Sequence, residues 1–275
     1  MRVVWQLLAV VVVSLIGGQS VAAVGDDPWL RLALGLLTAV LAVFVYAWVV
    51  GRTERRPVTE VSRRTAPGAL MRGTLIGVLW FASVVANIAF LGYYDVKGWG
   101  SATGAAGLFG FMAAASVTEE LLFRGVLFRT MEDRWGLWGA LIPTSALFGA
   151  WHLLNPDASL WGATVIALSA GPALGAAYVA TRNLWVPIGV HFGWNFAASG
   201  LFSTEVSGNN TEQGLLDAAT SGPTLLSGGD FGPEASLYTL VFGLIVTTGF
   251  LLLARRRGHV LPRRSKRAGT TAYAR

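Results

Sequence analysis

Runs of about 20 apolar residues constrain this chain most, because that length crosses the hydrocarbon core of a bilayer. Lipid offers the backbone no hydrogen-bond partner, so continuous apolar runs must form helices. Only 13% of the residues are charged and 53% are hydrophobic, which leaves too little polar surface for a soluble domain. We therefore expect an all-α fold, a polytopic membrane bundle of about eight transmembrane helices with no separate soluble domain. The runs lie at approximately residues 3–23, 30–50, 73–94, 104–129, 136–154, 160–181, 184–202 and 236–254.

The distribution of charge tests this helix count, since lysine and arginine collect in loops on the cytoplasmic side. Eight crossings that begin inside leave only Arg31 and Lys97 among the basic residues on the outer side. Most acidic residues fall outside: Asp26, Asp27, Asp95, Asp157, Glu205, Glu212, Asp217, Asp230 and Glu234. We predict a multi-pass protein of the cell membrane with both termini cytoplasmic. The formal net charge of +6 then reflects topology, and no nucleic-acid partner is expected.

Three segments are interpreted individually: the long loop, the basic tail and the first apolar run. Residues 203–235 are rich in Gly, Ser, Thr and Asn, which predicts a long outer loop with little regular structure. Residues 255–267 are basic, and we interpret them as a stop-transfer anchor, with contact to anionic headgroups as the alternative. Residues 1–23 are interpreted as a first span, although they also resemble a cleavable signal peptide.

Several hydrolase chemistries are excluded by the residues present. The chain has no cysteine, which rules out disulfides, thiolate metal ligands and a cysteine nucleophile. It contains no H-E-x-x-H zinc motif, no G-x-G-D in a helix, and no serine in an obvious nucleophile context. The remaining candidates for chemistry are glutamate, histidine and asparagine.

Adjacent glutamates stand in "TEELLFRG", residues 118–125, inside an apolar run. Glu120 and Arg124 are four residues apart on one helix face, which predicts a structural ion pair. Glu119 points about 100° away and has no basic residue on its own face. A carboxylate at this depth costs at least ~2.5 kcal/mol, so its partner is expected on another helix.

The neighbouring helices supply such partners. The midpoint of Glu119 and His152 falls between Trp135 and Gly136, where a turn is expected, so an antiparallel hairpin places both at equal depth. Asn195 follows His191 by four residues and shares its helix face. We predict that these four polar groups meet in one cavity, reached from the cytoplasmic half because His191 is nearer that end of its helix.

Structural interpretations of the same residues remain alternatives. Taken singly, either histidine can be explained by a hydrogen bond to a neighbouring carbonyl oxygen. Phe148 and Trp194 are expected to pack rather than to bind a ligand. A functional site is the better explanation of four polar residues at matched depth on three helices.

Three short motifs now resemble those of one family. "EELLFR" fits E-E-x-x-x-R, "FGAWH" with Phe148 and His152 fits F-x-x-x-H, and "HFGWN" fits H-x-x-x-N. In this order they are similar to the CPBP family of CAAX proteases and bacteriocin-processing enzymes, over about residues 100–200. The resemblance divides the chain into N-terminal helices with a basic loop (1–100), a catalytic core (101–202), the outer loop (203–235), a last helix (236–254) and a basic tail (255–275).

The resemblance implies an intramembrane endopeptidase. By analogy, Glu119 with His152 activates a water molecule, and His191 with Asn195 stabilises the oxyanion, while Glu120, Arg124 and Phe148 support them. A buried glutamate is a serviceable general base, and His and Asn donors stabilise developing charge. The family is often called metalloprotease, and Zn²⁺ held by His152 and His191 with a glutamate is one possibility. A metal-free, glutamate-activated water fits the same residues.

The expected partners are the lipid bilayer and a membrane-associated peptide or protein substrate. A prenylated C-terminus, a bacteriocin leader and a membrane protein's tail all remain open. The alternative from another class is a non-catalytic immunity or scaffold protein of the same fold. A proton-coupled transporter, in which Glu119 and the histidines relay protons, is a third.

Overall fold

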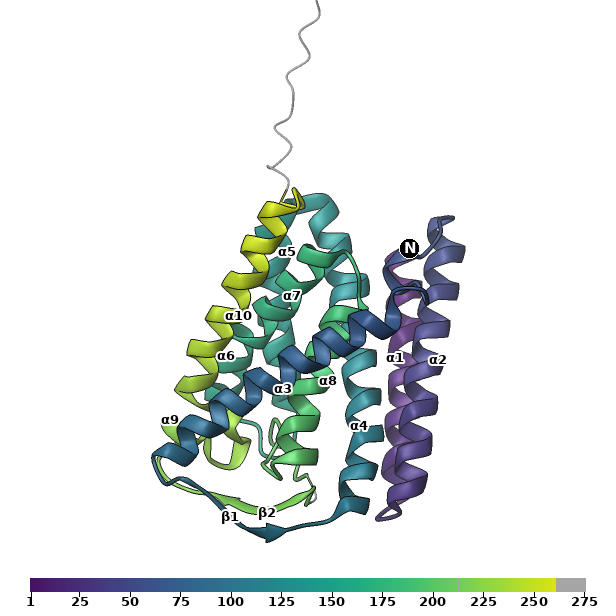
Figure 1. Cartoon of the computed structure of the whole chain (residues 1–275). Helices are drawn as coiled ribbons and strands as arrows, with labels where there is room; N and C mark the ends of the chain where they lie inside the picture. Colours follow the sequence, from purple (N-terminus) through teal and green to yellow (C-terminus); the bar gives the residue numbers. More distant parts are fainter. Residues whose placement is uncertain (212, 261–275) are drawn as a thin grey trace, which may run out of the picture.

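The computed structural model describes residues 1–211 and 213–260 as a helical bundle (Figure 1). Every apolar run predicted from the sequence is helical, so the all-α membrane bundle is confirmed. The helices are α1 (Arg2–Ala23), α2 (Pro28–Glu54), α3 (Ala66–Phe90), α4 (Ala102–Glu120), α5 (Arg129–Trp151), α6 (Leu160–Leu168), α7 (Ala170–Thr181), α8 (Trp185–Asn195), α9 (Thr224–Ser227) and α10 (Leu237–Arg256).

Among the described residues, six helical stretches are long and apolar enough to cross a membrane. One of them, Ala102–Leu154, contains both the fourth and the fifth predicted runs, which are separated by a break at Gly136. The seventh run has the expected length, because α8 is continued by the π-helix η4 (Phe196–Leu201). The chain is a multi-pass membrane protein in which two of the predicted spans are less regular than an ideal helix.

The fourth and fifth runs form the predicted hairpin. Gly136 reverses the chain at φ 73° and ψ −177°, a conformation that is essentially confined to glycine. Phe123 and Phe148, which are equidistant in sequence from this turn, have ring centroids 5.0 Å apart. The expected turn between Trp135 and Gly136 is therefore confirmed, and it brings the Glu119 end of α4 level with the end of α5.

Helix α3 crosses α8 diagonally, as Figure 1 shows. The two backbones approach closely because glycines face each other: a Cβ added at Gly77 would lie 2.1 Å from the Val190 carbonyl oxygen. On the other helix, a Cβ at Gly193 would lie 2.2 Å from the carbonyl oxygen of Thr74. Small residues permit this contact in a membrane, where close van der Waals packing drives helix association.

Residues 203–235 are more structured than the sequence predicts. Strand β2 (Leu216–Thr220) pairs antiparallel with β1 (Tyr94–Trp99), which precedes α4. The short helix α9 and two 3-10 turns, η5 (Gly229–Phe231) and η6 (Pro233–Ala235), follow. Phe231 and Ala235 are buried against the bundle. The expectation of little regular structure was wrong, because the segment folds back onto α6 and α8 and buries apolar surface of its own.

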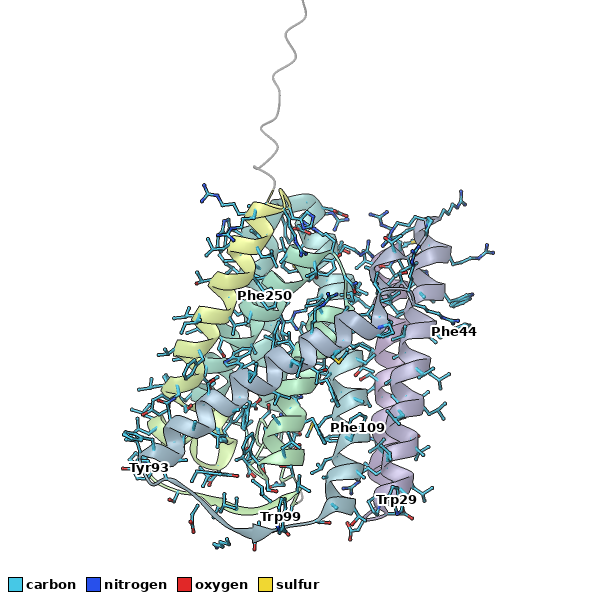
Figure 2. The ribbon with its side chains drawn as sticks, in the orientation of Figure 1. Trp29, Phe44, Tyr93, Trp99, Phe109 and Phe250 are labelled. Carbon is cyan, nitrogen blue, oxygen red and sulfur yellow. The ribbon has the colours of Figure 1, made fainter. Side chains whose placement is uncertain are left out.

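The start of α1 and the end of α10 lie at the same end of the bundle, and the β-sheet lies at the opposite end (Figure 1). Trp29, Tyr93 and Trp99 gather near the sheet end, as Figure 2 shows. Aromatic residues at such a level are typical of a membrane–water interface. The predicted contacts of the basic tail beyond Val260, like the placement of Glu212, lie outside the described residues.

Candidate active site

The ion pair predicted within α4 and its extension is present and fully buried. Arg124 Nη1 donates to Glu120 Oε1 over 2.7 Å, and the two side chains are 2% and 0% exposed. Arg124 Nη2 also donates to the carbonyl oxygen of Gly171 on α7, 3.0 Å away. Arg124 lies in the π-helix η2 (Leu121–Phe128), which continues α4. The pair therefore joins the fourth helix to α7 at the centre of the bundle.

His191 on α8 connects this pair to Glu119. Its Nδ1 lies 3.0 Å from Glu120 Oε1, which already accepts from Arg124, so Nδ1 carries the proton. Its Nε2 then faces Glu119 Oε2 across 3.9 Å. That gap exceeds a direct hydrogen bond and is the kind of polar contact in which a bridging water has to be considered. His191 is thus held in one tautomer and presents its second nitrogen to Glu119.

Glu119 contacts a residue of another helix, as the helix geometry predicts. Its side chain is 20% exposed, yet its Oε2 is buried and has no hydrogen bond. Within residues 1–211 and 213–260, Glu119 forms an ion-pair contact with His191 and none with His152. The structure therefore places His191 beside Glu119, where the hairpin argument alone had suggested His152.

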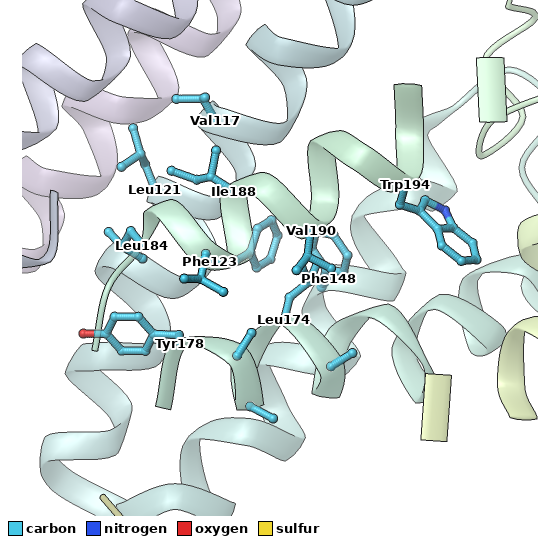
Figure 3. Packing of buried hydrophobic residues seen from close by; sticks show 14 of the residues in the cluster. Val117, Leu121, Phe123, Phe148, Leu174, Tyr178, Leu184, Ile188, Val190 and Trp194 are labelled. Carbon is cyan, nitrogen blue, oxygen red and sulfur yellow. The ribbon is translucent and has the colours of Figure 1, made fainter. Parts of the chain in front are cut away.

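His152 is oriented by the backbone of its own helix. Its Nδ1 donates to the carbonyl oxygen of Phe148 over 2.7 Å, which leaves Nε2 as the free ring nitrogen. The Phe148 ring lies between the two histidines, with centroids 4.9 Å from His152 and 5.7 Å from His191. The guanidinium carbon of Arg124 lies 4.4 Å from the same ring's centroid. Figure 3 shows Phe148 packed beside Val190 of α8, so this ring sets the spacing of the site.

A small cavity of about 20 Å³ is enclosed by His152, His191 and Asn195. This volume is enough for one water molecule, for which about 10–15 Å³ is the lower limit. Trp80 lines the same cavity, and its indole Nε1 is buried without a hydrogen-bond partner among the described residues. Three of the four predicted polar residues therefore line one water-sized cavity. The fourth, Glu119, contacts His191, which is one of these three.

Glu234 also lines this cavity, and the sequence interpretation missed it. We had assigned it to the acidic outer surface, whereas it is 4% exposed. Its Oε1 accepts from Trp194 Nε1, and its Oε2 accepts from Ser207 Oγ. Burial raises the pKa of Glu234, and the two hydrogen bonds oppose that effect. The one available signal was an isolated acidic residue close to the start of the last apolar run.

Two of the helices that carry the site, α4 and α8, change from α-helix to π-helix directly after their polar residues. The π-helix η2 begins immediately after Glu120, and the π-helix η4 begins immediately after Asn195. Such segments are rare and occur frequently at functional sites. Helical periodicity does not reveal them, which is why the sequence predicted two uninterrupted spans.

A wide apolar groove of about 810 Å³ adjoins the site. Its walls come from α2, α3, α4 and α8, with Phe44, Phe109 and Phe192 among them. Figure 2 labels Phe44 and Phe109 on α2 and α4, respectively. Val117 and Phe192 line the groove and stand two residues before Glu119 and directly after His191. The groove is therefore lined by the same two helices, α4 and α8, that carry Glu119 and His191.

The donor set does not fit a zinc centre. Structural and catalytic zinc sites use at least three protein ligands. In the part of the chain that the structure describes, no three His, Cys, Asp or Glu side chains are gathered so that they could share an ion. His152 and His191 each commit Nδ1 to a hydrogen bond with another group, so only Nε2 of either ring is left for a ligand. The zinc prediction stays a prediction.

Comparison with known families identifies the central part of the chain. The family model described as type II CAAX prenyl endopeptidase Rce1-like matches residues 100–197. This part of the chain is similar to the Rce1-like family. The match contains Glu119, Glu120, Arg124, His152, His191 and Asn195, and it confirms the resemblance drawn from the three motifs. Comparisons with curated proteins and with solved structures find no match.

The match to the Rce1-like model carries a general functional implication. Its family is one of CAAX-type membrane endopeptidases, which act on peptides associated with the bilayer. The N-terminal helices α1 and α2, most of α3, and the segment from residue 198 onward lie outside the match. Glu234 and Ser207 are thus contributed to the cavity by a part of the chain that the Rce1-like model does not cover.

Proposed function

We propose that this protein is an intramembrane endopeptidase in which Glu119 activates a water molecule for attack on a peptide bond. The observation that carries this proposal is the partnerless Glu119 Oε2, which faces His191 Nε2 across 3.9 Å beside a cavity for one water. An unpaired carboxylate at this depth is costly and contributes little to stability. A role in chemistry explains why it is there.

The attack uses a water held between Glu119 and His191. Glu119 accepts a proton from this water while the water oxygen bonds to the carbonyl carbon of the substrate, which gives a tetrahedral intermediate. His191 is kept in the required tautomer because its Nδ1–H donates to Glu120. Arg124 neutralises Glu120, so the proton acceptor is Glu119 and not its neighbour.

The intermediate then needs a donor for its oxyanion and a proton for the leaving amine. Asn195 lines the cavity and can donate its amide N–H to the oxyanion, an interaction worth several kcal/mol in a dry site. The proton taken by Glu119 passes to the amine nitrogen as the C–N bond breaks. His152 lines the same cavity, and its Nε2, which is left over by the Nδ1 hydrogen bond, can carry this proton.

The apolar groove suggests how a substrate is held. Its walls are mostly hydrocarbon, and they include α4 and α8, the helices that carry Glu119 and His191. An apolar stretch of a membrane peptide, or a lipid attached to one, suits such a surface. We therefore propose a lipid-modified or membrane-embedded peptide as substrate, with a C-a-a-X terminus as the first class to test.

The test compares wild-type protein with Glu119→Gln in proteoliposomes. A farnesylated peptide ending in C-a-a-X is the probe, and cleavage is followed by mass spectrometry. We expect wild type to cleave it and Glu119→Gln to lower kcat by roughly 10²- to 10⁴-fold, the range of general-base catalysis. Membrane peptides from cells with either variant would reveal a natural terminus present with wild type alone.

Asp133→Asn is the matched control, because Asp133 is an exposed acid in the Gly136 turn of the same hairpin. It should retain full activity. Cleavage that persists in correctly inserted Glu119→Gln would contradict the proposed role of Glu119, whereas a biological effect retained by this variant without any cleavage by wild type would favour the scaffold interpretation. Proton-coupled flux lost on the same substitution would favour a transporter.

A further inference from the structure

Four hydrogen-bonded residues link the His152 side of the cavity to the Asn195 side. Asn155, three residues after His152, donates from Nδ2 to the carbonyl oxygen of Ser207 over 2.7 Å. Ser207 donates from Oγ to Glu234 Oε2, and Trp194 donates from Nε1 to Glu234 Oε1. Trp194 immediately precedes Asn195 on α8. Glu234 is therefore the group at which both arms of the bridge meet.

The bridge is buried and is reinforced by the backbone. Ser207, Trp194 and Glu234 are all buried, and Asp157 N donates to the Gly208 carbonyl oxygen over 3.0 Å. Trp194 is further fixed by aromatic contacts with Trp80, whose centroid is 4.4 Å away. Within the described residues, Glu234 has no cation beside it. Burying an acid without a cation costs free energy, and apolar packing could hold the loop in place without that cost.

We propose that Glu234 is a positioning residue of the peptidase site, which holds Trp194 and Ser207 so that Asn195 and His152 stay aimed at one water molecule. This inference rests on the proposed function. Glu234 acts through its two hydrogen-bond donors, and the segment 203–235 thereby forms the closing wall of the site. Because Glu234 lies beyond residue 197, it is supplied by this chain in addition to the part that matches the Rce1-like model.

The experiment measures kcat and KM for Glu234→Leu, Glu234→Gln and Trp194→Phe on the farnesylated C-a-a-X peptide. Leucine removes both acceptors, whereas glutamine keeps one acceptor and can donate to Ser207. Phenylalanine retains the aromatic packing of Trp194 and removes its N–H. A misplacement of about 1 Å costs roughly 100-fold in rate, so we expect losses of this order in kcat for Glu234→Leu and Trp194→Phe.

Glu234→Gln should lie between wild type and Glu234→Leu, with KM within about threefold of wild type throughout because the groove is untouched. The double variant Glu234→Leu/Trp194→Phe should be no worse than either single variant, since both break the same bridge. Hydrogen exchange should rise in peptides covering residues 152–157 and 194–201. Asp230→Asn, an exposed acid in the same segment, is the control and should match wild type.

Unchanged kcat in folded Glu234→Gln and Trp194→Phe would overturn the inference. Losses that follow only the folded fraction, or that add in the double variant, would also overturn it. These outcomes leave the proposed function intact as long as Glu119→Gln is inactive. Cleavage that persists in Glu119→Gln would instead reject Glu119 as the general base, and absence of cleavage by wild type would reject the peptidase assignment itself.

Discussion

Arg124 shows how a single residue can hold a polar site inside a bilayer. Its guanidinium donates to Glu120 and to the Gly171 carbonyl, and it stacks against Phe148. Each of these partners is itself buried or part of the backbone. Removing one member of a buried pair leaves the other as an uncompensated charge, which is much worse than removing both.

We predict that Arg124→Met lowers the free energy of unfolding by about 3–5 kcal/mol, because Glu120 is left without a cation. The double variant Arg124→Met/Glu120→Gln should regain much of this loss, since glutamine still offers an oxygen to His191 Nδ1. Thermal unfolding in detergent, followed by circular dichroism, measures the difference. A double variant less stable than Arg124→Met would contradict this account.

At the scale of elements, the contact between α3 and α8 determines where His191 and Asn195 lie. Facing glycines let the two backbones touch, so α8 has little freedom to slide or rotate against α3. The polar residues of α8 project from the same short helix as these glycines. A change in helix spacing therefore reaches the candidate active site directly.

Gly193→Ala tests this contact, because the new Cβ would lie 2.2 Å from the Thr74 carbonyl oxygen. We expect a loss of about 1–3 kcal/mol in stability, the usual cost of overpacking, together with a lower kcat from displaced His191 and Asn195. Gly249→Ala on α10 is the control, since a Cβ there meets nothing within 4 Å. Equal stability and activity in the two variants would reject the crossing as the determinant of the site.

At the scale of the whole molecule, both described chain ends approach one end of the bundle, and the two-stranded sheet closes the other (Figure 1). This arrangement agrees with an even number of crossings. The distribution of basic residues predicts that the end with the termini is cytoplasmic. The β1–β2 sheet and the Glu234 segment would then face the outside.

The absence of cysteine makes this orientation directly testable. Lys97→Cys on β1 and Arg64→Cys before α3 each introduce one thiol at an exposed position. In intact cells, a membrane-impermeant maleimide should label Lys97→Cys and leave Arg64→Cys unlabelled until the membrane is permeabilised. Labelling with the opposite preference would invert the predicted topology.

The sequence by itself determined the class of fold, the hairpin at Gly136, the Glu120–Arg124 pair and the need of Glu119 for a partner on another helix. These follow from apolar length, helical spacing and the cost of charge in lipid, all of which act over short stretches of chain. The alternation of charge likewise yielded a topology before any contact was known.

Only the tertiary structure decided which histidine faces Glu119 and which further residues line the water-sized cavity. Equal depth in a hairpin brings His152 level with Glu119 but does not set the rotation of each helix, and the α3–α8 contact turns His191 toward it. Glu234 reaches the cavity because residues 203–235 fold back onto the bundle. Such long-range burial depends on packing between distant segments, and local composition does not predict it.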